Sequence, residues 1–256
     1  MKIGLIDVDG HNFPNLPLMK ISAYHKRNGD NVQWYDPLFD SLGESYDIVY
    51  MSKIFGSEYT QDYPYYVNAK KIIKGGTGYC IDIVEGKEVF DNAKHRDLPD
   101  IVEHIYPDYS LYPQYTKNTA YGFLTRGCCN NCSFCIVSKK EGICSHKVAN
   151  LNEFWIDQKN IKLLDANLLA CKEHVELLQQ LADSKARVDF TQGLDARFLN
   201  ERNLEILNEI NIQMLHFAFD FMKFEKQIVK GLRLAREHLK ITDRNAIVYI
   251  LTNYDT

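Results

Sequence analysis

The feature that most constrains the fold of this 256-residue chain is a repeated alternation of short apolar segments with amphipathic ones. Short apolar runs are typical of strands buried on both faces, and helical spacing of apolar residues is typical of the helices that cover them. In the N-terminal part, strands are expected at 3–8, 32–35 and 47–54, a helix over 16–27, and the end of a further helix over 67–74. Such strand–helix units predict a doubly wound, Rossmann- or flavodoxin-like parallel sheet over about residues 1–95.

A second series of units follows Asn118. Strands are expected at 120–124, 161–164, 187–190, 214–219 and 246–251, and helices over 172–181, 200–210 and 223–238. Asn200 is expected to cap the second of these helices. Polar residues follow each strand, and those after the last strand are Thr252 and Asn253. This pattern predicts a partial β/α barrel over residues 119–256, with reactive groups at the carboxyl ends of its strands.

Between the two series, residues 96–118 show no such periodicity. Tyrosines recur at every third position, at Tyr106, Tyr109, Tyr112 and Tyr115, and prolines are interspersed. This spacing predicts an extended, polyproline-like linker whose tyrosines pack against the domains.

Three cysteines after the first strand of the second series carry the clearest chemical signal. Cys128, Cys132 and Cys135 have the spacing Cys-x3-Cys-x2-Cys. Three thiolates can hold three corners of an iron–sulfur cube, whereas electron-transfer clusters usually have four cysteine ligands. The pattern therefore indicates a cluster whose fourth iron binds a small molecule. Because Cys129 is adjacent to Cys128, the sequence leaves open which of the two is the first ligand.

The alternative for the same segment is a non-catalytic module with a structural zinc site or an inert iron–sulfur site. Cys129, Cys132 and Cys135 could form a tetrahedral site with Cys144 or His146. Their spacing is too tight for paired zinc knuckles, and no second Cys-x2-Cys follows. Seven clustered cysteines do not suit a disulfide framework, so Cys80, Cys144 and Cys171 are expected to be free thiols.

The segment from Thr125 to Ile136 resembles the radical S-adenosylmethionine (SAM) superfamily, which has an aromatic residue such as Phe134 before its last cysteine. The resemblance implies a [4Fe-4S] cluster on Cys128, Cys132 and Cys135, with Phe134 lying against the adenine of SAM. It implies reductive cleavage of SAM to a 5′-deoxyadenosyl radical that acts on an unknown substrate. It also implies a partial barrel usually of six units, of which the sixth is expected to be missing here.

The same resemblance gives candidate SAM-binding residues at the strand ends. Asp165 and Asn167 lie where the family binds the SAM amino group, by charge-assisted hydrogen bonds. Arg197 could hold the SAM carboxylate in a bidentate manner, or could pair with Asp195. Gln192 and Asp220 could contact ribose or substrate, and Asp220 could instead cap the next helix.

The N-terminal domain resembles the cobalamin-binding domain of one radical SAM group. Asp9 and His11 match the aspartate and the cobalt-ligating histidine of a known motif, but Pro14 stands where that motif has glycine. Gly75-Gly76 is similar to its later glycine element. We therefore expect a cobalamin-binding-like fold in which cobalamin binding is possible but not expected, with a cobalamin-dependent radical methyltransferase as the alternative function.

Composition sets the remaining expectations. The chain is 45% hydrophobic and 25% charged, and its net charge is −4 without a long basic run, so nucleic-acid binding is not indicated. No apolar run is long enough for a membrane span. A strand directly after Met1 leaves no targeting segment, and free thiols fit a reducing cytoplasm. Lys139, Lys140 and Lys147 could attract a flavodoxin- or ferredoxin-like electron donor, or could be a solvated loop.

Overall fold

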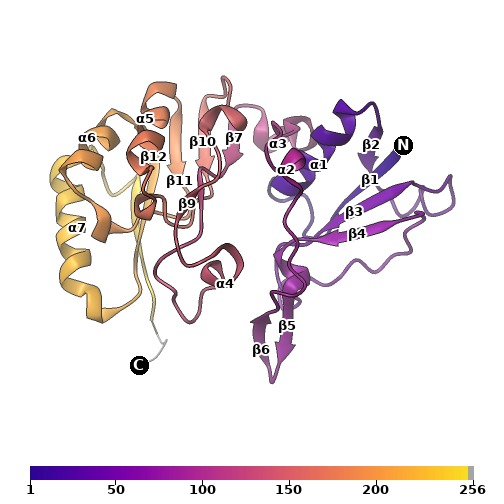
Figure 1. Cartoon of the computed structure of the whole chain (residues 1–256), viewed down its shortest axis with the longest axis horizontal. Coiled ribbons are helices and arrows are strands. Elements are labelled where there is room, and N and C mark those ends of the chain that lie inside the picture. Colours follow the sequence, from indigo (N-terminus) through magenta and orange to yellow (C-terminus); the bar gives the residue numbers. More distant parts are fainter. Residues whose placement is uncertain (253–256) are drawn as a thin grey trace. The chain divides into compact units, whose positions relative to one another are not determined.

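The computed structural model describes residues 1–252, which divide into two compact units. The first unit comprises Met1–Lys117 and the second begins at Asn118 (Figure 1). No helix among the described residues is both long enough and apolar enough to cross a lipid bilayer.

The first unit contains a four-stranded parallel sheet in the order β2-β1-β3-β4. Its elements are β1 (Lys2–Asp7), α1 (Leu16–Arg27), β2 (Asn31–Trp34), β3 (Ile48–Ser52) and β4 (Ile72–Gly75). The chain adds β2 on one side of β1 and then β3 on the other. The strand order therefore reverses between β1 and β3, where open α/β sheets commonly bind ligands.

Helix α1 spans the residues that the sequence predicted. It begins after Asn15, whose side chain accepts a hydrogen bond from Leu18 N, and it ends next to Gly29, which has a φ of +77°. Leu18 and Met19 are fully buried. The helix is therefore set by its cap and its apolar face together.

The predicted helix ending at Lys74 is wrong. Residues 72–75 form the edge strand β4, in which Ile72 pairs with Val49 of β3. Two adjacent β-branched residues favour this extended conformation, and the pairing partner comes from far along the chain. A short helix η1 (Thr77–Cys80) and an antiparallel hairpin follow, formed by β5 (Ile81–Val84) and β6 (Lys87–Phe90). The sequence did not predict this hairpin.

The segment 96–118 is not an extended linker in the structure. It contains α2 (Asp100–Glu103), η2 (Tyr109–Leu111) and α3 (Pro113–Thr116), and its residues up to Lys117 belong to the first unit. Asp108 holds it to α1 by accepting hydrogen bonds of 2.6 Å from Ser22 Oγ and Lys26 Nζ. The expectation that tyrosines pack here is confirmed for Tyr112, which is fully buried.

The second unit contains a five-stranded parallel sheet in the order β13-β12-β11-β10-β7, so each strand lies beside its predecessor. The strands are β7 (Thr119–Gly122), β10 (Asn160–Leu163), β11 (Arg187–Phe190), β12 (Asn211–Phe219) and β13 (Ala246–Ile250). The helices are α4 (Val137–Glu141), α5 (His174–Ser184), α6 (Glu201–Glu209) and α7 (Glu225–His238), with short 3-10 turns η3 (Leu151–Glu153), η4 (Leu168–Ala170), η5 (Ala196–Phe198) and η6 (Met222–Phe224). All five predicted strands are confirmed, and Asn200 caps α6 as expected. Asn253 lies outside the described residues.

The two faces of this sheet differ in character. One face carries fully or almost fully buried apolar residues, such as Ile161, Val188 and Leu215. Helices α5, α6 and α7 pack side by side in this unit (Figure 1), and α5 buries its leucines completely. The alternate residues of the strands form the opposite face, since side chains alternate along a strand. That opposite face contains charged and polar side chains.

Candidate functional site

The cysteine segment forms a closed loop at the carboxyl end of β7. Its base is a two-residue antiparallel ladder of β8 (Thr125–Arg126) and β9 (His146–Lys147). Just inside this ladder, Cys128 N donates a 3.2 Å hydrogen bond to the carbonyl of Gly142. The loop that carries the three cysteines is therefore tied together at both ends.

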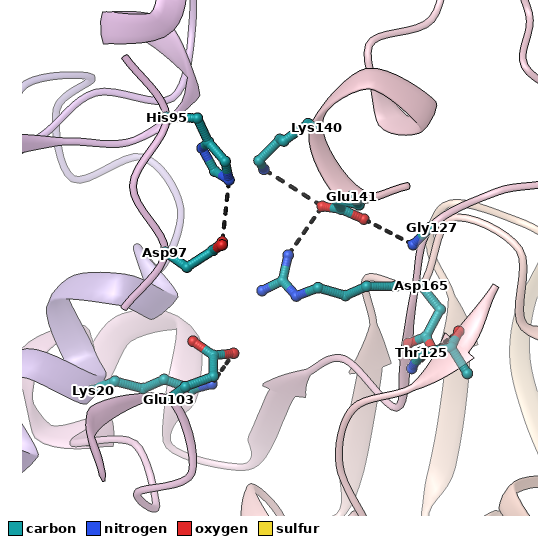
Figure 2. A network of polar contacts seen from close by, with 10 residues as sticks. Lys20, His95, Asp97, Glu103, Thr125, Gly127, Lys140, Glu141 and Asp165 are labelled. Atoms are coloured by element: carbon teal, nitrogen blue, oxygen red, sulfur yellow. Dashed lines mark hydrogen bonds and ion pairs between the residues drawn. The ribbon is translucent and has the colours of Figure 1, made fainter. Parts of the chain in front are cut away.

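Gly127 and Glu141 shape the entrance to the loop. Gly127 has a φ of +83°, and a side chain there would overlap the carbonyl of Cys144. Figure 2 shows Glu141 between Lys140 and Gly127: its Oε2 accepts from Gly127 N at 3.3 Å, and its Oε1 lies 3.5 Å from Lys140 Nζ. Oε1 also accepts a 3.0 Å hydrogen bond from Arg126. A glycine directly before Cys128 is thus a requirement of the loop's geometry.

Asp165, directly after β10, anchors the start of the loop. Its carboxylate accepts hydrogen bonds from Leu124 N at 3.1 Å, Thr125 N at 2.5 Å and Thr125 Oγ1 at 2.7 Å (Figure 2). Burial raises the pKa of Asp165 to about 6, although these hydrogen bonds oppose the increase. In this structure Asp165 positions the cysteine loop, and its contacts are all with the chain itself.

Asn167 links the same strand end to the first cysteine. Its Nδ2 donates a 3.5 Å hydrogen bond to Cys128 Sγ. The side chain is almost fully buried, and its Oδ1 has no hydrogen-bond partner among the described residues. Buried polar atoms are nearly always paired, so this oxygen is an acceptor available to a ligand.

The three predicted ligands influence one another's ionisation. Burial raises the pKa of Cys132, and the charges of Cys135 and Cys128 raise it further. Burial also raises the pKa of Cys135, and the charge of Cys128 adds to the increase. The charge of Cys128 therefore acts on both of the other thiols.

Cys129 is placed differently. It is exposed, and its Sγ lies 3.7 Å from Asn130 Oδ1. After burial, the main influences that raise its pKa are Cys128 and Asp195, and neither Cys132 nor Cys135 is among them. This arrangement favours Cys128 over Cys129 as the first member of the set.

The spacing of these thiols bears on the kind of metal centre. Among residues 1–252, no three His, Cys, Asp or Glu side chains lie close enough to hold a single metal ion. Thiolates around one zinc ion lie about 3.8 Å from one another, given Zn–S bonds of about 2.3 Å in a tetrahedron. An iron–sulfur cube distributes its thiolates over separate irons and so needs them farther apart. The two kinds of metal centre therefore differ in the thiol spacing that they need.

A second anchor of the loop involves Asn130, Asp195 and Arg197. Arg197 donates to both carboxylate oxygens of Asp195, from Nε at 2.9 Å and Nη2 at 2.6 Å. Its Nη2 also donates to Asn130 Oδ1 at 2.6 Å, and Asn130 Nδ2 donates to Asp195 Oδ2 at 3.1 Å. Burial opposes ionisation of Asp195, but these partners outweigh it and lower its pKa. Of the two predicted roles of Arg197, the structure shows the salt bridge to Asp195.

The other predicted residues at the strand ends remain open to solvent or ligand. Gln192 is exposed after β11 and has no hydrogen bond to a described residue. Asp220 follows β12 and has no hydrogen bond or ion pair within the described chain. Burial raises the pKa of Asp220, and its charge in turn raises the pKa of Cys132 and Cys135. The Asp220 carboxylate is therefore within electrostatic reach of two of the three cysteines.

Phe134 projects from the loop with 40% of its surface exposed. Its ring lies 5.9 Å from the ring of Phe221, centroid to centroid, with an interplanar angle of 31°. An exposed aromatic surface beside the cysteines suits a flat ligand ring, as the sequence predicted for adenine.

The predicted cobalamin residues of the first unit are not arranged for cobalt ligation. The Asp9 carboxylate accepts from Ile54 N at 2.5 Å and Phe55 N at 3.3 Å, so it holds a loop. The ring of His11 packs on Trp34 at a centroid distance of 4.2 Å, and burial lowers its pKa. Gly76 meets the backbone of Lys53, so the close approach there is to the chain itself. These residues do not fit a histidine-ligated cobalamin.

The sequence analysis missed a buried polar cluster at the end of β1. Tyr112 Oη donates a 2.7 Å hydrogen bond to Asp7 Oδ2, and Asn15 Nδ2 donates a 2.9 Å hydrogen bond to Ser52 Oγ. Burial raises the pKa of Asp7 to about 6, and its Oδ1 has no partner among the described residues. The signal available was an aspartate that closes an apolar run at the switch point of the sheet.

Comparison with known proteins gives a structural match alone. No protein-family model matches the chain, and no curated protein matches it in sequence. Its structure is similar to that of TsrM from Kitasatospora setae, a radical S-adenosylmethionine methyltransferase solved with cobalamin and a [4Fe-4S] cluster bound. The match has a TM-score of 0.59 at 10% sequence identity, and covers 97% of this chain and 69% of that one. The chain therefore has a mixed α/β fold of the kind seen in a radical SAM enzyme.

Proposed function

We propose that this protein is a radical SAM enzyme that binds a [4Fe-4S] cluster and cleaves SAM reductively. The observation that carries the proposal is the cysteine loop itself. Cys128, Cys132 and Cys135 share one loop after β7, where the charge of Cys128 raises the pKa of both other thiols, and Asp165 holds the start of that loop. In β/α barrels this edge is where catalysis takes place. The structural similarity to a radical SAM methyltransferase agrees with the proposal.

The chain's residues divide into ligands of the cluster and acceptors for SAM. Cys128, Cys132 and Cys135 would hold the cluster, which when bound supplies one electron to the sulfonium of SAM, yielding methionine and a 5′-deoxyadenosyl radical. Asn167 Oδ1 and the Asp220 carboxylate are hydrogen-bond acceptors without partners in the described chain. They suit the ammonium of SAM, which is a donor only.

The remaining roles concern orientation and the supply of electrons. Phe134 would support the adenine ring. Arg197 and Asp195 would hold the loop in place through Asn130. We also propose that a flavodoxin- or ferredoxin-like protein donates the electron to the cluster.

The test is formation of 5′-deoxyadenosine by anaerobically reconstituted protein with a strong reductant. Cys132→Ser should lose both acid-labile sulfide and 5′-deoxyadenosine. The adjacent Cys129→Ser is a matched control, because Cys129 is exposed and its pKa is not influenced by Cys132 or Cys135, and it should retain both. Cleavage of SAM by Cys132→Ser at the rate of the unchanged protein would contradict the proposal. One zinc per chain without sulfide would favour a non-catalytic zinc module instead.

A second candidate is a cobalamin-dependent radical SAM methyltransferase. The structural match favours this candidate. The match covers 97% of this chain, and therefore both units, and the matching enzyme was solved with cobalamin bound. Asp9 and His11 do not support histidine ligation, so this candidate requires a different binding mode. Equilibrium dialysis against hydroxocobalamin tests it directly, and retention of less than about one-tenth equivalent at about 100 µM, which means a Kd weaker than about 1 mM, would exclude it.

A further inference from the structure

The face of the second sheet opposite its apolar side carries a row of polar side chains. Lys162 of β10 pairs in register with Asp189 of β11, and His216 of β12 lies on the same face. Thr191, two residues after Asp189, continues the row to the carboxyl edge. The sequence analysis did not single out these residues.

Asp189 is the centre of this row. Only 8% of its surface is exposed. Its Oδ2 lies 3.7 Å from Lys162 Nζ, and its Oδ1 lies 4.0 Å from His216 Nδ1. Neither distance is that of a hydrogen bond, and Oδ1 is buried without a hydrogen-bond partner among residues 1–252. Lys162 therefore offsets the charge of Asp189 while one carboxylate oxygen stays unpaired.

His216 presents a second acceptor. Its Nδ1 lies 3.0 Å from the carbonyl of Phe190, and because a carbonyl only accepts, this nitrogen carries the hydrogen. In the neutral ring Nε2 is then an acceptor. The ring stacks on Tyr249 at a centroid distance of 5.5 Å and an interplanar angle of 9°, which fixes its plane.

The row also contains a third unpaired atom. Thr191 Oγ1 is buried and has no hydrogen-bond partner in the described chain. Buried polar atoms without partners are few in folded proteins, and each requires an explanation. Packing alone does not explain these unpaired atoms, because apolar residues of similar size would pack here without leaving polar atoms unpaired.

We propose that Lys162, Asp189, Thr191 and His216 form the substrate subsite of the enzyme, and that the subsite binds a neutral amide group. The N–H of the amide donates to Asp189 Oδ1 or to His216 Nε2, and its carbonyl accepts from Thr191 Oγ1 or Lys162 Nζ. A neutral group fits because Lys162 already offsets the charge of Asp189. This inference rests on the proposed function, since the row lies on the sheet whose carboxyl edge carries the cysteine loop.

The test uses the full chain with cluster and SAM bound, and small amides as probes. Ligand-observed NMR would measure the binding of N-methylacetamide, with N,N-dimethylacetamide as the matched probe that lacks an N–H. We expect saturable binding of N-methylacetamide and about tenfold weaker binding of the dimethyl compound, the effect of one lost hydrogen bond. Acetate and methylammonium serve as the charged probes, and both should bind more weakly than the amide.

Variants assign the binding to this row. Asp189→Leu should weaken N-methylacetamide binding about tenfold. His216→Phe, which keeps the stacked ring, should weaken it severalfold and provides an answer if Asp189→Leu does not fold. Asp183→Asn, an exposed carboxylate on α5, should leave binding unchanged. Equal binding of the two amides, preferential binding of acetate, or full binding by His216→Phe and Asp189→Leu would overturn the proposal.

The result for amide binding can be distinguished from the result for SAM cleavage, which tests the proposed function. Formation of 5′-deoxyadenosine in the absence of substrate does not depend on Asp189. Loss of SAM cleavage with retained amide binding would refute the enzyme class, and the converse would refute the subsite alone.

Discussion

Asp165 supports a quantitative prediction about the pH dependence of folding. The carboxyl group is buried, and its pKa is raised from 3.8 to about 6 in the folded chain. Between these two values the folded state binds more protons than the unfolded state. The contribution of Asp165 to the free energy of unfolding therefore falls as the pH rises from about 4 to about 6, and it is constant above that range.

The size of the effect follows from the shift. A rise of the pKa from 3.8 to about 6 corresponds to about 3 kcal/mol. Asp7, whose pKa is also raised to about 6, adds a contribution of the same sign in the first unit. Wild-type protein should thus be more stable at pH 5 than at pH 7, which is opposite to the usual behaviour of carboxylates that gain partners on folding.

The perturbation is Asp165→Asn, which removes the titrating group and keeps the side-chain shape. Urea unfolding of the apo protein at several pH values between 4.5 and 7.5, followed separately for the two units, should show about 2 kcal/mol less pH dependence in the second unit, because the rest of the effect lies below pH 4.5. A carbon-13 titration of wild-type Asp165 should give a midpoint near 6. Asp183→Asn is the control, because Asp183 is exposed on α5, and it should leave the profile unchanged.

The same variant tests the anchoring role of Asp165. An asparagine amide places an NH2 group against at least one of the donors Leu124 N, Thr125 N or Thr125 Oγ1. The Thr125 amide should then exchange with solvent at least tenfold faster, roughly the loss of one hydrogen bond. An unaltered pH profile in Asp165→Asn, or a carboxyl midpoint below 4, would refute the reasoning.

Two further predictions concern side chains that the fold holds in place. Tyr112→Phe removes the donor to Asp7 Oδ2 and should lower the free energy of unfolding of the first unit by about 1.5–3 kcal/mol, measured in urea; a change below about 0.5 kcal/mol would show that the hydrogen bond is unimportant. Gly127→Ala combines a φ of +83° with overlap of the Cys144 carbonyl, whereas Gly142→Ala has a φ of +97° and open space. Gly127→Ala should therefore reduce the iron bound per chain far more than Gly142→Ala, and equal losses would point to backbone strain alone.

The sequence predicted the second unit well because its signals are local. Each of its five strands is a short apolar run, and β7 and β10 bury alternate residues. Asn200 marks the start of α6 with its own side chain. Strand β4 was mistaken for a helix end because its conformation depends on pairing with β3, more than 20 residues earlier in the chain. The segment 96–118 was mistaken for an extended linker because Tyr112 and Asp108 pack against distant residues.

The candidate site shows the same division. The spacing of the three cysteines could be seen in the sequence, because it is a property of a single loop. The hydrogen-bond partner of a polar side chain at a strand end could not be seen in the sequence, because several groups in the folded chain compete for that side chain. Arg197 takes Asp195 and Asn130 as partners, and Asp165 takes the backbone of Leu124 and Thr125.

These choices of partner determine which residues are left to bind a ligand. Asp165 and Asp195 follow β10 and β11, and both are used to hold the cysteine loop. Asn167 and Asp220 follow β10 and β12, and each keeps an acceptor without a hydrogen bond in the described chain. Two anchors make the loop rigid, and two open acceptors beside it favour a ligand that carries an ammonium group. Because the anchoring carboxylates and the open acceptors come from adjacent strands, a shift of the loop would displace the cysteines relative to both acceptors at once. Loss of either anchor should therefore weaken SAM binding and cluster retention together, whereas loss of Asp220 should weaken SAM binding alone.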